Sequence, residues 1–124
     1  MLLDSNIIIY ATQPEYDNLR RFIADHVPFV SAISYVEVLG YHKLADQDRQ
    51  DLEEFFSLVP ILQITSPILD EAVRLRQYKK MSLGDALIAA TALMHQLTLV
   101  TRNTKDFTWI NGLSILDPMS ETIQ

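Results

Sequence analysis

Four acidic residues in this 124-residue chain stand where an apolar segment meets a turn or the start of a helix: Asp4, Glu37, Asp85 and Asp106. The stretches between them are long enough to form complete helices and strands. In an open α/β sheet, strand ends and the first turns of the following helices gather groups from distant parts of the chain into one crevice. The spacing therefore predicts that the four carboxylates assemble into one site, and carboxylate oxygens are ligands of hard divalent cations.

Three of these acids also fit a purely structural role. Each follows a serine or asparagine by three residues, as in a capping box, where the acid reaches back to a free backbone amide. The pairs are Ser34 with Glu37, Ser82 with Asp85, and Asn103 with Asp106. For any one pair taken alone, a cap is the more common explanation. Capping and metal binding are nevertheless compatible, because a helix N-terminus favours the ionised carboxylate that a hard cation requires.

Asp4 has no such structural explanation. It follows Met-Leu-Leu, and the first basic residue along the chain is Arg20. A carboxylate at the end of a buried strand needs a compensating partner, because burying an unpaired charge is costly. Three capped acids together with one unpartnered acid favour a functional site.

Hydrophobic periodicity and turn residues predict strands that alternate with helices. Strands are expected at residues 1–4, 29–32, 61–64, 97–101 and 113–116, and helices at residues 15–25, 34–44, 48–59, 66–80 and 85–93. Residues 5–11 are expected to be helical, although Ile7-Ile8-Ile9 also suits a strand, and residues 103–107 form a polar loop or short helix. This alternation is typical of an α/β domain whose mostly parallel sheet of four or five strands is covered on both faces.

Two of the expected helices carry further signals. Ser66 is the expected N-cap of its helix, with a proline at the first helical position. Residues 85–93 are apolar on almost every face, so this helix should be buried at the centre of the domain. An acidic residue at the head of a buried helix is unusual and supports a role for Asp85 in a site.

The composition predicts a single folded domain over residues 1–124. A hydrophobic content of 48% is ample for one packed core. The chain has no cysteine, which excludes disulfides, thiolate metal sites and a catalytic cysteine. No apolar run approaches the roughly 20 residues of a membrane span, and no targeting segment opens the chain. We therefore expect a soluble, cytoplasmic protein with no membrane partner.

The net charge of −6 argues at first against a nucleic-acid partner, which normally requires a basic surface. If the four candidate acids are set aside, the excess of acidic over basic residues falls from six to two, and bound cations would offset the carboxylates themselves. Six basic residues gather near the later acids: Arg74, Arg76, Lys79, Lys80, Arg102 and Lys105. They suit a phosphate backbone, and they equally suit the solvated faces of helices.

Several other chemistries are excluded. The three glycines of the chain cannot build a phosphate-binding loop or a dinucleotide fingerprint. The three histidines lack the spacing of a paired metal site, and no Gly-x-Ser-x-Gly elbow supports a serine nucleophile. A phosphate-accepting receiver domain has this size and sheet type, but the strand expected at residues 61–64 does not end in the aspartate that such a domain needs.

The residues around the candidate acids resemble a known family. The motifs are Asp4-Ser5-Asn6 after the first strand, Glu37 in a helix, DALIAATAL from Asp85 and VTRNTKDF from Val100. Over essentially the whole chain they resemble the PIN domain, and most closely the toxin ribonucleases of bacterial and archaeal toxin–antitoxin pairs, called VapC-type. The chain departs from the family at Ser5, where threonine is more common, and the neighbours of Glu37 are less distinctive.

The resemblance implies a function and a set of site residues. It implies that Asp4, Glu37, Asp85 and Asp106 form an acidic set that binds Mg²⁺ or Mn²⁺, with Asn6, Thr101 and Asn103 as supporting polar groups. It also implies a PIN-like three-layer fold, an RNA substrate, a homodimer and a cognate antitoxin protein. The alternatives are a PIN-type RNA maturation nuclease, which often carries extra modules, and a nuclease-inactive PIN-like domain that binds RNA or protein, which the intact acidic set opposes.

Overall fold

The structure is a computed structural model that describes residues 1–121. At its centre lies a five-stranded sheet, with strands β1 (Leu2–Leu3), β2 (Phe29–Ser31), β3 (Ile61–Leu62), β4 (Leu99–Val100) and β5 (Ile115–Leu116). The strand order is β3-β2-β1-β4-β5, and every pairing is parallel. The predicted α/β class is confirmed, and all five expected strands form, although each is shorter than expected.

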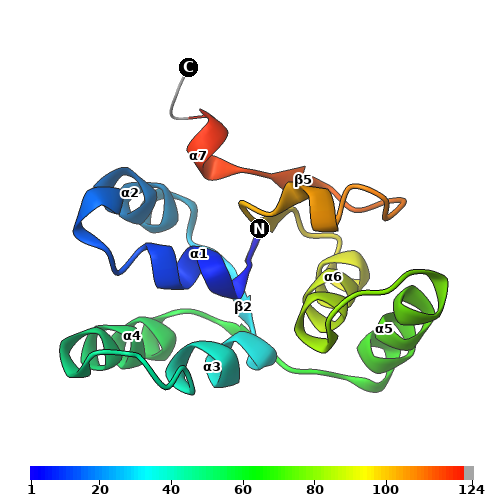
Figure 1. Cartoon of the computed structure of the whole chain (residues 1–124), viewed down its shortest axis with the longest axis horizontal. Coiled ribbons are helices and arrows are strands. Elements are labelled where there is room, and N and C mark those ends of the chain that lie inside the picture. The colour runs from blue at the N-terminus through cyan, green and yellow to red at the C-terminus, as the bar shows by residue number, and fades with distance from the viewer. Residues whose placement is uncertain (122–124) are drawn as a thin grey trace.

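Helices cover both faces of this sheet. They are α1 (Ser5–Tyr10), α2 (Asp17–His26), α3 (Ala32–Leu39), α4 (Asp46–Leu58), α5 (Ser66–Tyr78), α6 (Leu83–His95) and α7 (Pro118–Glu121), with 3-10 turns η1 (Pro14–Tyr16) and η2 (Thr104–Asp106). Figure 1 shows α1 to α4 on one side of the strands and α5 and α6 on the other. None of the helices in residues 1–121 has both the length and the apolar character needed to cross a membrane.

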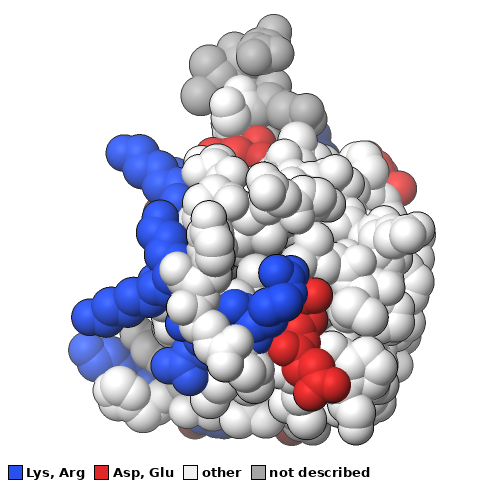
Figure 2. Space-filling model, turned by 90° about the vertical axis from the view of Figure 1, so that its right-hand side faces the viewer, with Lys and Arg blue, Asp and Glu red and all other residues white. Residues whose placement is uncertain are grey.

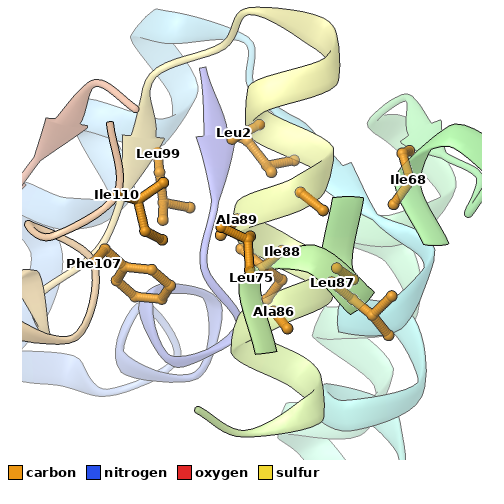
Figure 3. Packing of buried hydrophobic residues seen from close by; sticks show 13 residues of the cluster. Leu2, Ile68, Leu75, Ala86, Leu87, Ile88, Ala89, Leu99, Phe107 and Ile110 are labelled. Atoms are coloured by element: carbon orange, nitrogen blue, oxygen red, sulfur yellow. The ribbon is translucent and has the colours of Figure 1, made fainter. Parts of the chain in front are cut away.

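The two cores follow from the alternation of side chains along the strands. Leu2 and Leu99 face α5 and α6, whereas Leu3 and Val100 face α1, α2 and α4. Successive residues of a strand point to opposite faces, so β1 and β4 each supply one side chain to each core. Figure 3 shows the first core, in which Phe107 joins Leu99 beside α6. The three-layer arrangement fixes the strand ends rigidly between two packed layers of helices.

Helix α6 lies between the sheet and α5. Its residues 86–92 are all buried, as the sequence predicted for an apolar helix at the domain centre. Ser82 is its N-cap and accepts a hydrogen bond from the Asp85 amide at 3.1 Å. The helix begins two residues before the predicted start, which places Asp85 in its first turn.

Two predicted caps are wrong. Helix α3 begins at Ala32 because Ser31, rather than Ser34, is its N-cap and accepts a hydrogen bond from the Ile33 amide at 3.1 Å. Helix α5 begins at Ser66 itself, with Thr65 in the N-cap position and no side-chain cap.

Other element boundaries also differ from the prediction. Helix α3 ends at Leu39, several residues earlier than predicted, with Gly40 as its C-cap. Helix α7 was not predicted. Residues 5–10 form a helix rather than a strand, which leaves Asp4 at the junction between β1 and α1.

Candidate active site

The central strand ends at the candidate site. Asp4 follows β1, and Thr101 follows the neighbouring strand β4, while the Asp4 amide extends the ladder between them by donating to the Val100 carbonyl at 2.9 Å. The strand order reverses between β1 and β4, and the crevice beyond such a switch point is where open α/β sheets bind ligands. Both side chains are buried, with exposed fractions of 4% for Asp4 and 0% for Thr101.

Two hydrogen bonds in series orient the Asp4 carboxylate. The Thr101 hydroxyl donates to Asp4 Oδ2 at 2.8 Å and accepts from the Asn103 backbone amide at 3.1 Å. No lysine, arginine or histidine of residues 1–121 forms an ion pair with Asp4. Asp4 is therefore a fixed, buried carboxylate whose charge has no cationic partner among the described side chains.

A second series of hydrogen bonds holds Glu37. Ser5 Oγ donates to Glu37 Oε1 at 2.6 Å and lies 2.8 Å from Ser34 Oγ. Because a serine hydroxyl carries one proton, and Ser5 donates it to Glu37, Ser34 must donate to Ser5. Ser5 and Ser34 are buried, so this arrangement joins α1 to the middle of α3 and directs Glu37 toward the crevice.

Gly84 provides room for Glu37 at the start of α6. A side-chain carbon at Gly84 would overlap Glu37 Oε2, which means that the carboxylate lies directly against the glycine backbone. Glu37 therefore contacts groups from three helices, namely Ser5 of α1, its own helix α3 and Gly84 of α6. An acid so placed is not a capping residue of α3.

The four acids influence one another electrostatically. Burial raises the pKa of Asp4, and repulsion from Asp85 and Glu37 raises it further, while the hydrogen bond from Thr101 opposes the rise. The pKa of Asp85 is also raised, first by burial and then by repulsion from Asp106 and Glu37, against the opposing hydrogen bond of Ser82. Crowded carboxylates of this kind disfavour ionisation until a positive charge enters between them.

The structure brings the four predicted acids near enough to repel one another, but it does not gather them into a finished ion site. Glu37 and Asp106 are exposed, Asp85 is half-buried, and within residues 1–121 no three acidic or histidine side chains lie close enough together to hold an ion as they stand. Of the predicted supporting groups, Thr101 contacts Asp4 directly, and Asn103 contributes its backbone amide. Asn6 is exposed, and its side chain forms no hydrogen bond with any described residue.

Sequence reasoning missed Ser5, Ser34 and Gly84 as members of the site. Ser5 and Ser34 are buried polar residues in otherwise apolar helical segments. A buried hydroxyl requires a hydrogen-bond partner, so a serine on the apolar face of a short helix beside a candidate acid was the available signal.

A cleft opens beside Asp85 and Asp106. It has a volume of about 580 Å³, and basic side chains line it together with Trp109: Arg76, Lys79, Lys80 and Lys105. Figure 2 shows Lys and Arg side chains gathered along one margin and the centre of this side of the molecule, while much of the rest is uncharged. The other two predicted basic residues lie differently, because Arg74 pairs with Glu71 and Arg102 lies over the rings of Tyr10 and Tyr16.

Comparison with known families decides the identity of this fold. The family model of the PIN domain matches residues 1–111. The chain belongs to the PIN domain family. A solved toxin-antitoxin complex from Klebsiella pneumoniae contains a chain with 34% sequence identity and a TM-score of 0.76, over 94% of this chain and 96% of that one.

Two further relatives of this PIN domain come from Rickettsia felis. Ribonuclease VapC2 is 29% identical to this chain in an alignment that covers 90% of this chain and 92% of that protein. A structure of VapBC2 bound to a DNA fragment from its promoter contains a chain with 26% identity and a TM-score of 0.75, over 93% of this chain and 96% of that one. The predicted PIN-like fold is confirmed over almost the full length.

Proposed function

We propose that this PIN domain is the toxin of a toxin–antitoxin pair, an endoribonuclease that hydrolyses RNA phosphodiester bonds in the cytoplasm. The observation that carries the proposal is Asp4, a buried carboxylate fixed by Thr101 at the switch point of the sheet and repelled by Asp85 and Glu37. The similarity to Ribonuclease VapC2 along nearly the whole of both chains supports the same activity.

The residues present fit a hard divalent cation. The four candidate acids, Asp4, Glu37, Asp85 and Asp106, offer only oxygen donors, and oxygen sites select Mg²⁺ or Mn²⁺ over metals that prefer nitrogen or sulfur. The buried charge of Asp4 has no cationic partner among the described side chains, and a cation would supply one. When bound, the cation would activate water for in-line attack on phosphorus and offset charge on the leaving oxygen.

The protein itself positions and separates the participating groups. Thr101 and the Asn103 amide keep Asp4 in one orientation, and Ser5 and Ser34 do the same for Glu37. Pre-oriented groups of this kind lower the cost of reaching the reactive geometry. Asp106 stands at the rim beside the basic cleft, where a phosphodiester strand would enter.

An antitoxin that inhibits this site should present a basic segment to the four acids. Arginine or lysine placed among carboxylates forms charge-assisted hydrogen bonds and competes with a cation for the same space. An apolar groove of about 700 Å³ offers the same partner a second contact, lined mainly by Ile8, Ile23, Leu52, Phe55 and Val59 between α1, α2 and α4. An amphipathic helix is the kind of segment that such a groove accepts.

The chain is also proposed to form a homodimer. Exposed apolar side chains on the neighbouring helices α3, α5 and α6 support this, since a group of them can form an apolar contact surface. They are Val36, Leu69, Val73 and Leu83. Sedimentation of the purified chain measures its mass in solution. Replacing Val36 and Val73 by aspartate should convert a dimer to a monomer.

A growth assay tests the toxin proposal against a maturation nuclease and an inactive binding domain. Induction of the wild-type chain should arrest growth, induction of Asp4→Asn should not, and co-expression of a cognate antitoxin should restore growth. Immunoblotting must show equal amounts of both soluble proteins. A wild-type chain that accumulates in soluble form without harm in a suitable host would contradict the toxin function.

A further inference from the structure

The basic cleft beside Asp85 and Asp106 contains both charged and aromatic groups. Lys79 and Lys80 come from the loop after α5, Lys105 from η2, and Trp109 from the turn that follows η2. The cleft is therefore built from two segments that lie about 25 residues apart, and both lead directly into residues of the acidic site. Its position makes it continuous with the mouth of that site.

The lysines of this cleft form no ion pair with any described acid, although Asp85 and Asp106 line the same cleft. The ion pairs in residues 1–121 join Arg20 and Arg21 to Asp17 and Arg74 to Glu71, and none includes a lysine of the cleft. Arg76 is held in place because its Nε donates to the Met81 carbonyl at 3.2 Å. Unpaired lysines beside acids that repel one another leave a surface with positive charge available to an anionic ligand.

An aromatic pair lies at the edge of the cleft, because Trp109 lines it and the ring of Tyr78 stacks on Trp109. The rings of Tyr78 and Trp109 are within 8° of parallel, with centroids 5.7 Å apart, and Lys79 Nζ lies 5.5 Å from the centroid of the Trp109 ring. Trp109 Nε1 donates to the Asp106 carbonyl at 2.9 Å, which ties the ring to the backbone of a site acid. Tyr78 is 81% exposed, so burial of apolar surface does not explain its position.

We propose that this cleft is the subsite that holds the single-stranded RNA next to the bond that is cut. Lys80 and Lys105 bind phosphates, and the pair formed by Tyr78 and Trp109 stacks an unpaired base. This inference rests on the proposed ribonuclease function. Aromatic side chains beside a basic groove are the usual means of holding a single strand, because every base has a face that can stack and every nucleotide carries a phosphate.

The same chemistry disfavours the antitoxin as the occupant. The segment that inhibits the acidic site is expected to be basic, and lysines repel such a segment. RNA can bind the lysines through its phosphates and the aromatic pair through its bases. An acidic peptide can bind the lysines, but it has no flat group to stack on the aromatic pair. The cleft thus distinguishes substrate from inhibitor.

Binding of RNA to a chain that cannot cut it tests the subsite. The background is the full chain carrying Asp4→Asn, and the probe is a fluorescent single-stranded RNA measured by anisotropy at several salt concentrations. Replacing Lys80 and Lys105 by glutamine should weaken binding at least tenfold and reduce the slope of log K against log salt by about 1.4, since each phosphate contact to a single strand contributes about 0.7. Tyr78→Ala should weaken binding about fivefold or more and leave the slope unchanged.

Matched controls separate local from general effects. Replacing Arg21 and Lys43 by glutamine removes the same charge from exposed positions outside the cleft and should change binding less than threefold. Tyr78 is preferred to Trp109 for the aromatic test because Trp109 also packs against the core. Thermal unfolding of every variant should match that of the background protein.

The results distinguish this inference from the function on which it rests. If the wild-type chain cuts RNA while the cleft variants bind RNA as tightly as the background, the subsite is wrong and the ribonuclease remains. If the cleft variants lose binding of the antitoxin and keep binding of RNA, the cleft is a protein-binding surface and the subsite is again overturned. If the wild-type chain neither cuts nor binds RNA, both proposals fail.

Discussion

The four acids of the site fall into two pairs that the protein treats differently. In the first pair, each carboxylate accepts a hydrogen bond from a buried hydroxyl, Asp4 from Thr101 and Glu37 from Ser5. We call Asp4 and Glu37 the hydrogen-bonded pair for this reason. Asp85 and Asp106, the cleft pair, line the opening that carries the lysines and Trp109. The first pair is fixed from within the fold, and the second faces the side from which a substrate would arrive.

This difference separates two tasks within one acidic site. Buried hydroxyls hold a carboxylate in one orientation and stabilise its charge, which prepares it to bind a cation. Asp85 and Asp106 line an open cleft beside lysines, where they can adjust to a strand of RNA. Substitutions of the hydrogen-bonded pair or of its hydroxyl partners should therefore mainly weaken cation binding. Substitutions of the basic and aromatic residues of the cleft should mainly weaken RNA binding.

Asp4→Asn should have the largest effect on activity. Loss of a residue that only supports a metal ligand typically costs up to about 100-fold. Asp4→Asn removes a proposed ligand itself, so cleavage of RNA should fall by more than that. Stability of the metal-free protein near neutral pH should stay equal or rise, since the amide still accepts the Thr101 hydrogen bond and no longer repels Asp85. Cleavage rates and urea unfolding in chelator measure both effects. A less stable but active variant would show that Asp4 is structural.

Thr101→Val should weaken Mn²⁺ binding by about 10- to 100-fold, because Asp4 loses the donor that orients it. Isothermal titration calorimetry measures the affinity. Thr91→Val is the matched control, since Thr91 is equally buried but donates only to the Leu87 carbonyl within α6. Equal losses of affinity in both variants would mean that destabilisation, and not orientation of Asp4, is responsible.

Ser5→Ala should have a smaller effect and weaken cation binding by about 3- to 10-fold. This loss is below the range usual for residues that support a metal ligand, because Glu37 is exposed and water can replace the missing hydroxyl. Gly84→Ala should act in the same direction by displacing Glu37 from its position against the glycine. Ser57→Ala, which removes an exposed hydroxyl far from the site in sequence, is the control. No change in affinity for either site variant would remove Glu37 from the cation-binding set.

The pH dependence of stability should show the smallest effect. The folded state raises the pKa of Asp4 and Asp85 above their ordinary value of 3.8, so the native protein holds these protons more tightly than the unfolded chain. Their contribution to stability is complete below that value and is lost as pH rises through the raised pKa values. In chelator, wild-type stability should decline over this window relative to Asp4→Asn. Parallel pH profiles of the two proteins, measured by urea unfolding, would contradict the raised pKa of Asp4.

The hydrogen-bonded pair also shows which parts of the site could be predicted from the sequence. Asp4 could be recognised from local features, because it directly follows an apolar strand and has no basic residue near it in the sequence, and Asp85 could be recognised because it heads an apolar helix. Thr101 entered through the family motif alone. The confirmed strands and helices followed from periodicity, which local sequence expresses directly.

The support for Glu37 could not be predicted in this way. Its partner Ser5 lies 32 residues earlier in the chain, and contact between them depends on how α1 packs against α3. The local pattern was also misleading, since Ser34 suggested a capping box while Ser31 is the true N-cap. Short-range signals locate helix ends only to within a few residues. Here the error made Glu37 resemble a capping residue of α3.

The central claim is that the four acids act by holding a divalent cation, and chelation tests it most directly. Purified wild-type chain is incubated with labelled single-stranded RNA in excess EDTA, and Mg²⁺ or Mn²⁺ is then restored, with Asp4→Asn treated in parallel to detect contaminating ribonuclease. We predict no cleavage in EDTA, recovery with either cation for the wild type, and no recovery for the variant. Undiminished cleavage by the wild type in excess EDTA would contradict the account.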